Sequence, residues 1–440
     1  GNVWRTIADE GHPSSPLFNP DGTMTYSAVY SIGDQLYGKS RRIYENNQTQ
    51  TTFTALANFF DNRLRINADF TYNSRHNATN TRMVRTPYSK TLGVIETIDG
   101  TQSYMSETFY DYTYITTNEF VEYEQTFAGK HYFKALVGFN YEQESYKRTY
   151  ARANDLIDSS VENIQLAEGV TIEDGSIVSG EKTTEGNWTK WRNAGVFFRL
   201  NYAYADRYLV EINGRYDGSS KFPDNSQWAF FPSVSAGWRL SEEPWFNVSK
   251  QAVSNIKIRA SIGGLGNNNV KAYLYKELFT LDKSPLVING SSPTVTSIPS
   301  TIPDSLTWET AVTGDVGLDL GFLGGRLNLT ADGYIRKTLD MFCVGPTLPE
   351  VFGASSPKGN YGEMTTRGYE LNISWADRFD AGGKPFHYSI KASLSDYVSK
   401  IDKFNNATGN LGDYYAGQTI GEIWGFISNG LYQTQEEVDR

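Results

Sequence analysis

The chain has 440 residues, a formal net charge of −10 and a single cysteine. Negative charge disfavours contact with nucleic-acid phosphates, so we expect no nucleic-acid partner. One cysteine, Cys343, excludes a disulfide framework and a cysteine-based metal cluster within the chain. Four histidines scattered at positions 12, 76, 131 and 387 do not predict a metal site. We therefore predict neither a metal nor a cofactor.

The composition favours strands and turns, with 40 Gly, 29 Tyr and 24 Phe. The chain also exceeds the roughly 250–300 residues at which a single soluble core stops growing. The chain contains no run of about 18 apolar residues, which a transmembrane helix would need. A membrane barrel is still possible, because its apolar surface comes from every second residue of each strand. The opening residues GNVWRTIADE lack the basic start and apolar core of a signal peptide. We expect either a processed N-terminus or an internal fragment of a longer protein.

Alternation of apolar and polar residues predicts strands along the chain. In one segment Tyr208, Val210 and Ile212 alternate with Glu211 and Asn213. Segments with this pattern are, in chain order, 63–72, 194–202, 208–216, 227–240, 256–262, 308–319, 327–336, 369–375 and 386–395. Most of them are about nine to thirteen residues long, near the length that a tilted strand needs to cross a bilayer, whereas soluble strands average about five or six. We therefore predict an all-β fold, a transmembrane antiparallel β-barrel.

The two faces of these strands are predicted to meet different surroundings. The apolar face is expected to contact outer-membrane lipid through Val196, Phe198, Val210, Ile212, Val234, Leu329, Ile373 and Ile390. Aromatic residues lie at the ends of this face, among them Tyr202, Tyr208, Trp238, Trp308 and Trp375. Their placement is typical of the interfacial girdles of membrane barrels. The charged face needs water, which a wide lumen supplies.

Loop lengths alternate in the way a membrane barrel requires. Short turns are predicted at 60–62, 128–130, 205–206, 323–325 and 380–383, and long loops at 74–116, 148–190, 217–227, 264–304, 338–362 and 400–425. Short turns belong on the periplasmic rim and long loops outside the cell. One connection on the short-turn rim, Ser241–Ser254, is longer and contains Pro244-Trp245. Pro232 falls within a strand and predicts a bulge or bend. We expect roughly twelve to fourteen strands.

Several motifs carry a family resemblance. They are RYDGSSKF at 215–222, WAFFPS at 228–233, GWR at 237–239, KIRAS at 257–261, GN at 266–267, WE at 308–309, GLD at 317–319, YIRKT at 334–338, DM at 340–341, GEM at 362–364, RGYEL at 367–371, IG at 420–421, GF at 425–426 and GLYQ at 430–433. In this order and spacing, across about 190–435, they closely resemble SusC/RagA-like TonB-dependent outer-membrane transporters.

The resemblance implies a large plugged barrel of roughly twenty-two strands in the bacterial outer membrane. It also implies import of oligosaccharides or peptides, powered through TonB, with a SusD-like surface lipoprotein capping the mouth. Residues 1–440 would then form part of the barrel, with long extracellular loops. The plug, the TonB-contacting segment and the C-terminal strands of such proteins are not recognisable in this chain.

Charged residues on the lumen-facing side are the candidate site. They are Arg199, Glu211, Arg215, Arg259, Asp315, Asp319, Asp332, Arg336 and Glu370. These side chains are suited to hold a plug by hydrogen bonds and ion pairs, or to contact the solute. We favour the plug, because a filled lumen offers partners along its whole height.

Catalysis finds little support in the sequence. No Gly-x-Ser-x-Gly nucleophile motif and no phosphate-binding glycine loop is present, so we predict no catalytic residue and no enzyme activity. Three alternatives to an importer stay open: a surface scaffold or adhesin on the same barrel, an outer-membrane enzyme, and a soluble β-sandwich glycosidase or lectin.

Overall fold

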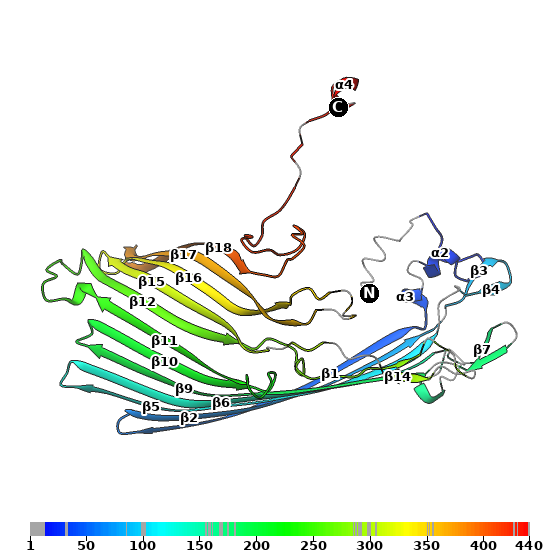
Figure 1. Ribbon diagram of the computed structural model, residues 1–440, viewed down its shortest axis with the longest axis horizontal. Coiled ribbons are helices and arrows are strands. Elements are labelled where there is room, and N and C mark those ends of the chain that lie inside the picture. Colours follow the sequence, from blue (N-terminus) through cyan, green and yellow to red (C-terminus); the bar gives the residue numbers. More distant parts are fainter. Residues whose placement is uncertain are drawn as a thin grey trace. The chain divides into compact units, whose positions relative to one another are not determined.

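A computed structural model describes the chain (Figure 1). It covers residues 14–438 apart from 31–33, 85, 98–102, 155, 157–159, 161, 167–169, 174–175, 180–181, 285, 287, 289–292, 297–300, 304–305, 350, 352, 354–355, 426 and 429.

Long strands dominate the described part of the chain and form one twelve-stranded sheet (Figure 1). In their order along the sheet they are β1 (Arg41–Phe59), β2 (Leu64–Met83), β5 (Tyr104–Phe127), β6 (His131–Asn154), β9 (Lys182–Tyr204), β10 (Tyr208–Ser219), β11 (Trp228–Arg239), β12 (Val253–Asn267), β15 (Glu309–Phe322), β16 (Leu327–Val344), β17 (Lys358–Ala381) and β18 (Lys384–Lys403). Each neighbour in the sheet is also the next long strand in the sequence, which is the up-and-down order of a membrane barrel. The predicted all-β fold and strand number are confirmed.

The remaining elements are short and lie outside the long strands, either between them or toward the two ends of the chain. The short strands pair as β3 (Tyr88–Thr91) with β4 (Val94–Glu96), β7 (Val170–Glu173) with β8 (Ser176–Ser179), and β13 (Leu281–Lys283) with β14 (Thr294–Thr296). The helical turns are α2 (Tyr26–Ala28), α3 (Asp34–Tyr37), η2 (Ile164–Leu166), η3 (Leu240–Glu242) and α4 (Gln435–Val438). Among the described residues, every helix is too short or too polar to cross a membrane.

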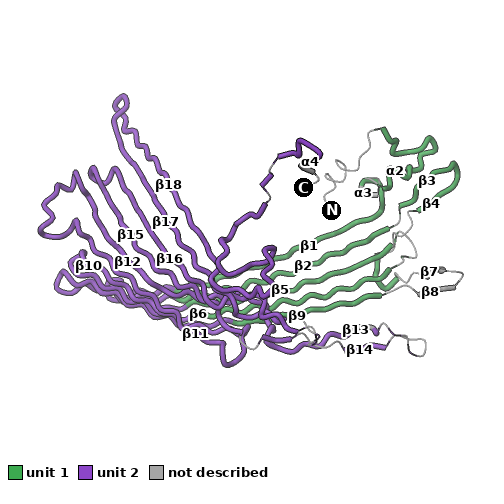
Figure 2. Tube along the Cα trace, turned by 45° about the horizontal axis from the view of Figure 1, so that its top comes forward, with its two compact units in different colours: residues 1–55, 68–118, 141–192 green, residues 56–67, 119–140, 193–440 purple. Residues whose placement is uncertain are grey.

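The chain divides into two compact units, coloured separately in Figure 2. The first unit comprises residues 1–55, 68–118 and 141–192, and the second comprises 56–67, 119–140 and 193–440. All nine candidate site residues, and all the strands from β10 onward, belong to the second unit.

The strand register in the second unit keeps the two predicted faces distinct. Leu200 pairs with Ile212, Ile212 with Val234, and Val234 with Ile262, so apolar residues from four strands form one row. Paired residues in neighbouring strands point to the same face of the sheet, and successive residues along a strand point to opposite faces. The polar residues that alternate with this row along each strand therefore lie on the other face. Ile212 and Val234 are each 43% exposed. This exposed apolar face is the one we predicted to contact lipid.

The short turns follow from residues that tolerate positive φ. Gly382 (φ 60°) and Gly383 (φ 80°) alone join β17 to β18, and both angles suit a type I′ hairpin turn. At the turn after β9, Ala205 (φ 50°) and Asp206 (φ 55°) adopt the same left-handed region without glycine. The predicted short turns are confirmed at these positions.

The predicted strand lengths are wrong for most of the sheet. β5, β6 and β17 each have 24 residues, and much of the predicted loop 74–116 is strand at the ends of β2 and β5. Parts of the predicted loops 148–190, 264–304 and 338–362 lie outside the described residues. The strands extend beyond the predicted segments into stretches where both faces are polar. The alternation that identifies a membrane-crossing segment is lost there, so the predicted strands were too short.

The main apolar core is a cluster beside β11, and it corrects the prediction for Trp308. Phe222, Phe231, Leu306 and Trp308 are buried together, with the Trp308 ring 5.2 Å from Phe222 and 5.4 Å from Phe231. The Trp308 indole N–H donates to the carbonyl of Gln227 at 2.9 Å. Trp308 precedes β15 and is only 7% exposed, so it is not a girdle residue. The motif segments around 222, 231 and 308 therefore meet in one place.

Pro232 limits the pairing of β11 on one side. β11 pairs with β10 continuously through Gly214↔Pro232, without a bulge. Its pairing with β12 begins only at Ser233↔Gly263, because proline has no N–H for the ladder. Beyond that point the ring of Phe231 lies against Gly266 of β12. The predicted bulge is absent at this proline, and a one-sided end of pairing replaces it.

Candidate functional site: a polar wall on the sheet

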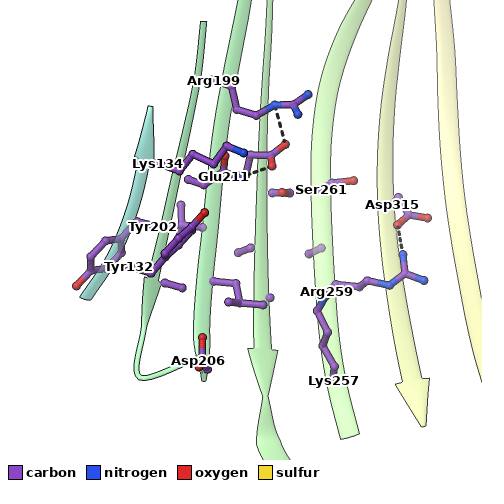
Figure 3. A pocket seen from close by; sticks show the side chains of 18 residues that line it. Tyr132, Lys134, Arg199, Tyr202, Asp206, Glu211, Lys257, Arg259, Ser261 and Asp315 are labelled. Atoms are coloured by element: carbon purple, nitrogen blue, oxygen red, sulfur yellow. Dashed lines mark hydrogen bonds and ion pairs between the residues drawn. The ribbon is translucent and has the colours of Figure 1, made fainter. Parts of the chain in front are cut away.

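One face of β9 to β17 carries the nine predicted site residues, and we call this face the polar wall. The strands present Arg199 on β9, Glu211 and Arg215 on β10, Arg259 on β12, Asp315 and Asp319 on β15, Asp332 and Arg336 on β16, and Glu370 on β17. A hollow of about 680 Å³ opens on this wall between β6 and β15 (Figure 3). Its lining includes Lys134, Arg199, Glu211, Arg259 and Asp315.

Arg259 is the centre of an ion-pair cluster on the wall. Its guanidinium lies 2.7 Å from Asp332, 3.3 Å from Asp319 and 3.7 Å from Asp315. Its side chain is 31% exposed, and that of Asp332 is 15% exposed. Charge-assisted hydrogen bonds from one planar guanidinium to several carboxylates fix its direction. Three carboxylates share one cation, so the cluster contains more carboxylates than cations.

A glycine on the intervening strand allows the Arg259 side chain to reach Asp332. Arg259 on β12 pairs in register with Gly317 on β15, and Gly317 pairs with Asp332 on β16. A Cβ atom on Gly317 would lie 2.5 Å from both the Arg259 guanidinium carbon and an Asp332 carboxylate oxygen. The ion pair therefore spans the intervening strand only because that strand has no side chain there.

A second network joins β9 and β10. Arg199 donates to Asn213 at 2.7 Å and lies 3.8 Å from Glu211, and Figure 3 shows this pair beside the hollow. Glu211 also accepts hydrogen bonds from Asn213 and Asn201. Arg199 remains 54% exposed, so much of its guanidinium faces the solvent side of the wall. Half-exposed ion pairs of this kind contribute little to the free energy of folding. Their polar groups can therefore exchange partners at little cost.

The structure does not bring all nine residues together. Arg215 pairs bidentately with Asp217 on its own strand, at 2.8 and 3.0 Å, and lies over the ring of Phe197. Arg336 donates to Thr313 at 3.3 Å. Glu370 lies opposite Asp332 in the register of β16 and β17. Asp217 lies within β10 and not in the loop predicted at 217–227.

A further group of charged residues, on β2, β5 and β6, was not among the predicted site residues. Lys134 lies 2.7 Å from Glu122 and 3.8 Å from Glu124, and Arg65 contacts the same two carboxylates. Tyr132 donates to Glu124 at 3.1 Å. A partial signal was present, because Phe133, Ala135, Val137 and Phe139 recur at every second position along β6, although Leu136 between them is also apolar. Here opposite charges are closely matched, unlike the acidic excess around Arg259.

The wall's chemistry is that of reversible polar contact. It offers guanidinium and ammonium donors, carboxylate acceptors and amides that do both. Within the described ranges, no group of three or more His, Cys, Asp or Glu side chains is arranged to hold a metal ion. The wall can therefore hold a polar partner by hydrogen bonds and ion pairs.

Comparison with known proteins decides the family. Residues 5–436 match the family model for the β-barrel of TonB-dependent receptor-like proteins. The chain belongs to this family. As a TonB-dependent receptor barrel, it is 27% identical to TonB-dependent receptor P3 of Formosa agariphila, over 96% of this chain and 41% of that protein. It is 30% identical to TonB-dependent receptor SusC of Bacteroides thetaiotaomicron, over 55% of this chain and 25% of that protein.

Solved structures show the same fold. The barrel aligns with the RagAB peptide importer in its closed-closed state with a TM-score of 0.71 and 20% identity, covering 86% of this chain and 38% of that one. The open-open state gives a TM-score of 0.70. The chain thus spans about two fifths of the length of the first relative and of these structures. TonB-dependent receptor barrels of this kind are outer-membrane proteins, and the predicted family and location are confirmed.

Proposed function

We propose that this barrel imports oligosaccharides or peptides across the bacterial outer membrane, as part of a TonB-dependent transporter. Its membership of the receptor family supports the transport. The RagAB peptide importer, which shares the fold of this chain, supports peptides as one class of cargo, and oligosaccharides follow from the motif resemblance to SusC/RagA-like transporters. We further propose that the protein acts only as a transporter and carries no enzyme activity.

The observation that carries the proposal is the polar wall. Both signs of charge and several amides lie on one face of the sheet, and the opposite face is apolar and exposed. An adhesin or scaffold needs an apolar face for the membrane, but it has no use for ion-pair networks along the lumen. A polar plug needs them, because its own backbone and side chains must find hydrogen-bond partners inside the barrel.

We propose that the nine wall residues contact the plug before they contact cargo. The acidic excess around Arg259 fits a plug segment that presents Arg or Lys. In this proposal the plug and the TonB-contacting segment come from the part of the relatives' length that these 440 residues do not span. A SusD-like lipoprotein and TonB are the proposed partners, on the extracellular and periplasmic sides.

The test is uptake by a deletion strain carrying the full-length gene or its variants. Growth on a panel of glycans and peptides as sole carbon source assigns the cargo class. Arg259→Ala should slow growth on the transported polymer, while Arg326→Ala, which removes an arginine paired with Asp377 at a short turn outside the hollow, should not. Unaltered uptake of every polymer by the deletion strain would contradict import and favour a surface scaffold.

A further inference from the structure

The connection between β11 and β12 is far longer than the other turns on its rim. It runs from η3 (Leu240–Glu242) to the start of β12 at Val253, whereas Gly382 and Gly383 alone join β17 to β18. It contains the apolar stretch Pro244-Trp245-Phe246. The transport proposal gives no role to this stretch.

A buried carboxylate fixes where the connection lies. The side chain of Glu243 is 4% exposed. It accepts hydrogen bonds from the Trp238 indole N–H at 2.9 Å and from Arg207 at 2.8 Å, and the polar Tyr208 hydroxyl also favours its charged form. These donors hold the pKa of Glu243 below its usual range, Tyr208 and Trp238 acting more strongly than Arg207. The carboxylate is thus charged and held by three partners at neutral pH.

Two of these partners belong to the apolar face. Tyr208 and Trp238 pair directly in the register of β10 and β11, on the same face as Val210 and Ala236. Along β11 the even-numbered residues Val234 and Ala236 are exposed, but Trp238 is only half-exposed. The connection therefore folds back over the apolar face at the rim, and away from the polar wall.

The exposed part of the connection includes large apolar side chains. Trp245 is 60% exposed and Val248 is 44% exposed, and the Trp245 and Phe246 rings meet edge to face at 6.4 Å. Backbone hydrogen bonds from Phe246 to Glu243 and from Asn247 to Trp245 make this a tight turn. Lys250 closes it by donating to the carbonyl of Ser241 at 2.8 Å. A fixed turn that exposes a tryptophan next to a lipid-facing surface needs an apolar partner.

We infer that residues 244–248 form a membrane anchor that inserts into the headgroup region of the periplasmic phospholipid leaflet. The surface is continuous with the apolar face of an outer-membrane barrel. Aromatic rings prefer this level of a bilayer, and the exposed ammonium of Lys250 suits a lipid phosphate. The choice of leaflet rests on the proposed orientation, in which the short-turn rim is periplasmic.

The test is a depth measurement on full-length protein in vesicles of phosphatidylethanolamine and phosphatidylglycerol. A nitroxide is placed at Trp245→Cys or at Asp206→Cys in a Cys343→Ser background. Asp206 is the matched control, since it belongs to the same rim but lines the polar hollow. Power saturation should show position 245 preferentially accessible to oxygen and position 206 to a water-soluble nickel chelate. Equal preference for the chelate at both positions would overturn the anchor.

The role of Glu243 is tested in the same vesicles. Glu243→Ala should release the turn and remove the oxygen preference at position 245. Glu242→Ala, which breaks only the exposed pair with Lys250, should leave it unchanged. Gel mobility of unheated samples identifies folded barrels, so misfolding cannot be read as release. Loss of the oxygen preference in both variants, or in neither, would contradict the Glu243 anchor.

Orientation and transport are measured separately. A membrane-impermeant maleimide should not label Asp206→Cys in intact cells. Labelling there would overturn the choice of leaflet. The depth result does not depend on uptake, so a failed uptake assay leaves the anchor standing and a failed depth assay leaves import standing.

Discussion

Arg259 on β12 pairs with Asp332 on β16 at 2.7 Å by crossing over Gly317 of the strand between them. This relationship ties three strands through one side chain, and it depends on a residue that contributes no atoms to it. Gly317 is therefore as important for the wall's charge arrangement as the ionised groups.

Gly317→Ala should lower the free energy of unfolding by about 1–3 kcal/mol, the usual range for forcing extra volume into a packed site. The new Cβ would contact the Arg259–Asp332 pair. Gly314→Ala on the same strand is the matched control, because a Cβ there meets nothing within 4 Å. Urea unfolding of both variants in lipid vesicles measures the difference, and equal losses would contradict the crossing.

Ile212→Arg should destabilise the barrel by about 2–4 kcal/mol if this residue lies near the bilayer midplane. Val210 lies only two residues from the rim residue Tyr208, so we expect a smaller cost for Val210→Arg. Asn213→Arg should cost far less, because that position faces the polar wall. Single-cysteine labelling checks the faces: a water-accessible Ile212 with a lipid-accessible Asn213 would show that the assignment is reversed.

Trp308→Ala should cost about 3–5 kcal/mol, as large aromatic truncations in cores do. Trp308→Phe should cost about 1 kcal/mol from the lost hydrogen bond to Gln227, plus some packing. Trp228→Ala is the comparison, since its ring is 48% exposed, and it should cost less than Trp308→Ala. The readout is again unfolding in vesicles, and a reversed order would place Trp308 outside the core.

Protein in intact cells should be cut by added protease within 148–190 or 264–304, unless a partner shields these loops. It should not be cut at Ala205-Asp206 or Gly324-Gly325. Fragment masses identify the cleaved bonds. Cleavage at the short turns would mean that the rims are assigned to the wrong sides of the membrane.

The stabilising effect of Glu243 should depend on pH in one direction. Its pKa in the folded protein is lowered from the ordinary 4.5, so the folded state favours the charged form. The contribution is complete above the ordinary pKa and is lost as the pH falls through the lowered value. The stability difference between the parent and Glu243→Gln should therefore be constant at neutral pH and shrink only in strong acid. A difference that shrinks already between pH 6 and about 5 would contradict this sign.

The sequence predicted the faces of the strands better than their ends. Tyr208 to Tyr216 shows its alternation because lipid and water select opposite residue types on the two faces. β5 and β6 are longer than a membrane-crossing strand needs to be. Where a strand extends beyond the membrane, neither face contacts lipid, so apolar and polar residues do not alternate there. Trp308 was misplaced because its parity matches the apolar face of β15, although the strand begins only at Glu309. The pairing of Arg259 with Asp332 could not be foreseen, since it depends on the register of three strands.

Pro232 has a mechanical consequence for the barrel wall. From Ser233 toward the short-turn rim, β11 and β12 are joined by a backbone ladder; on the other side of Pro232, aromatic rings around Phe231 join them instead. A ladder of backbone hydrogen bonds resists shear because several bonds must break together. Packed side chains, in contrast, can separate one contact at a time. Under a pulling force the wall should open first along this seam. The loops that leave β10 and β12 could then separate without unzipping the strands that cross the membrane.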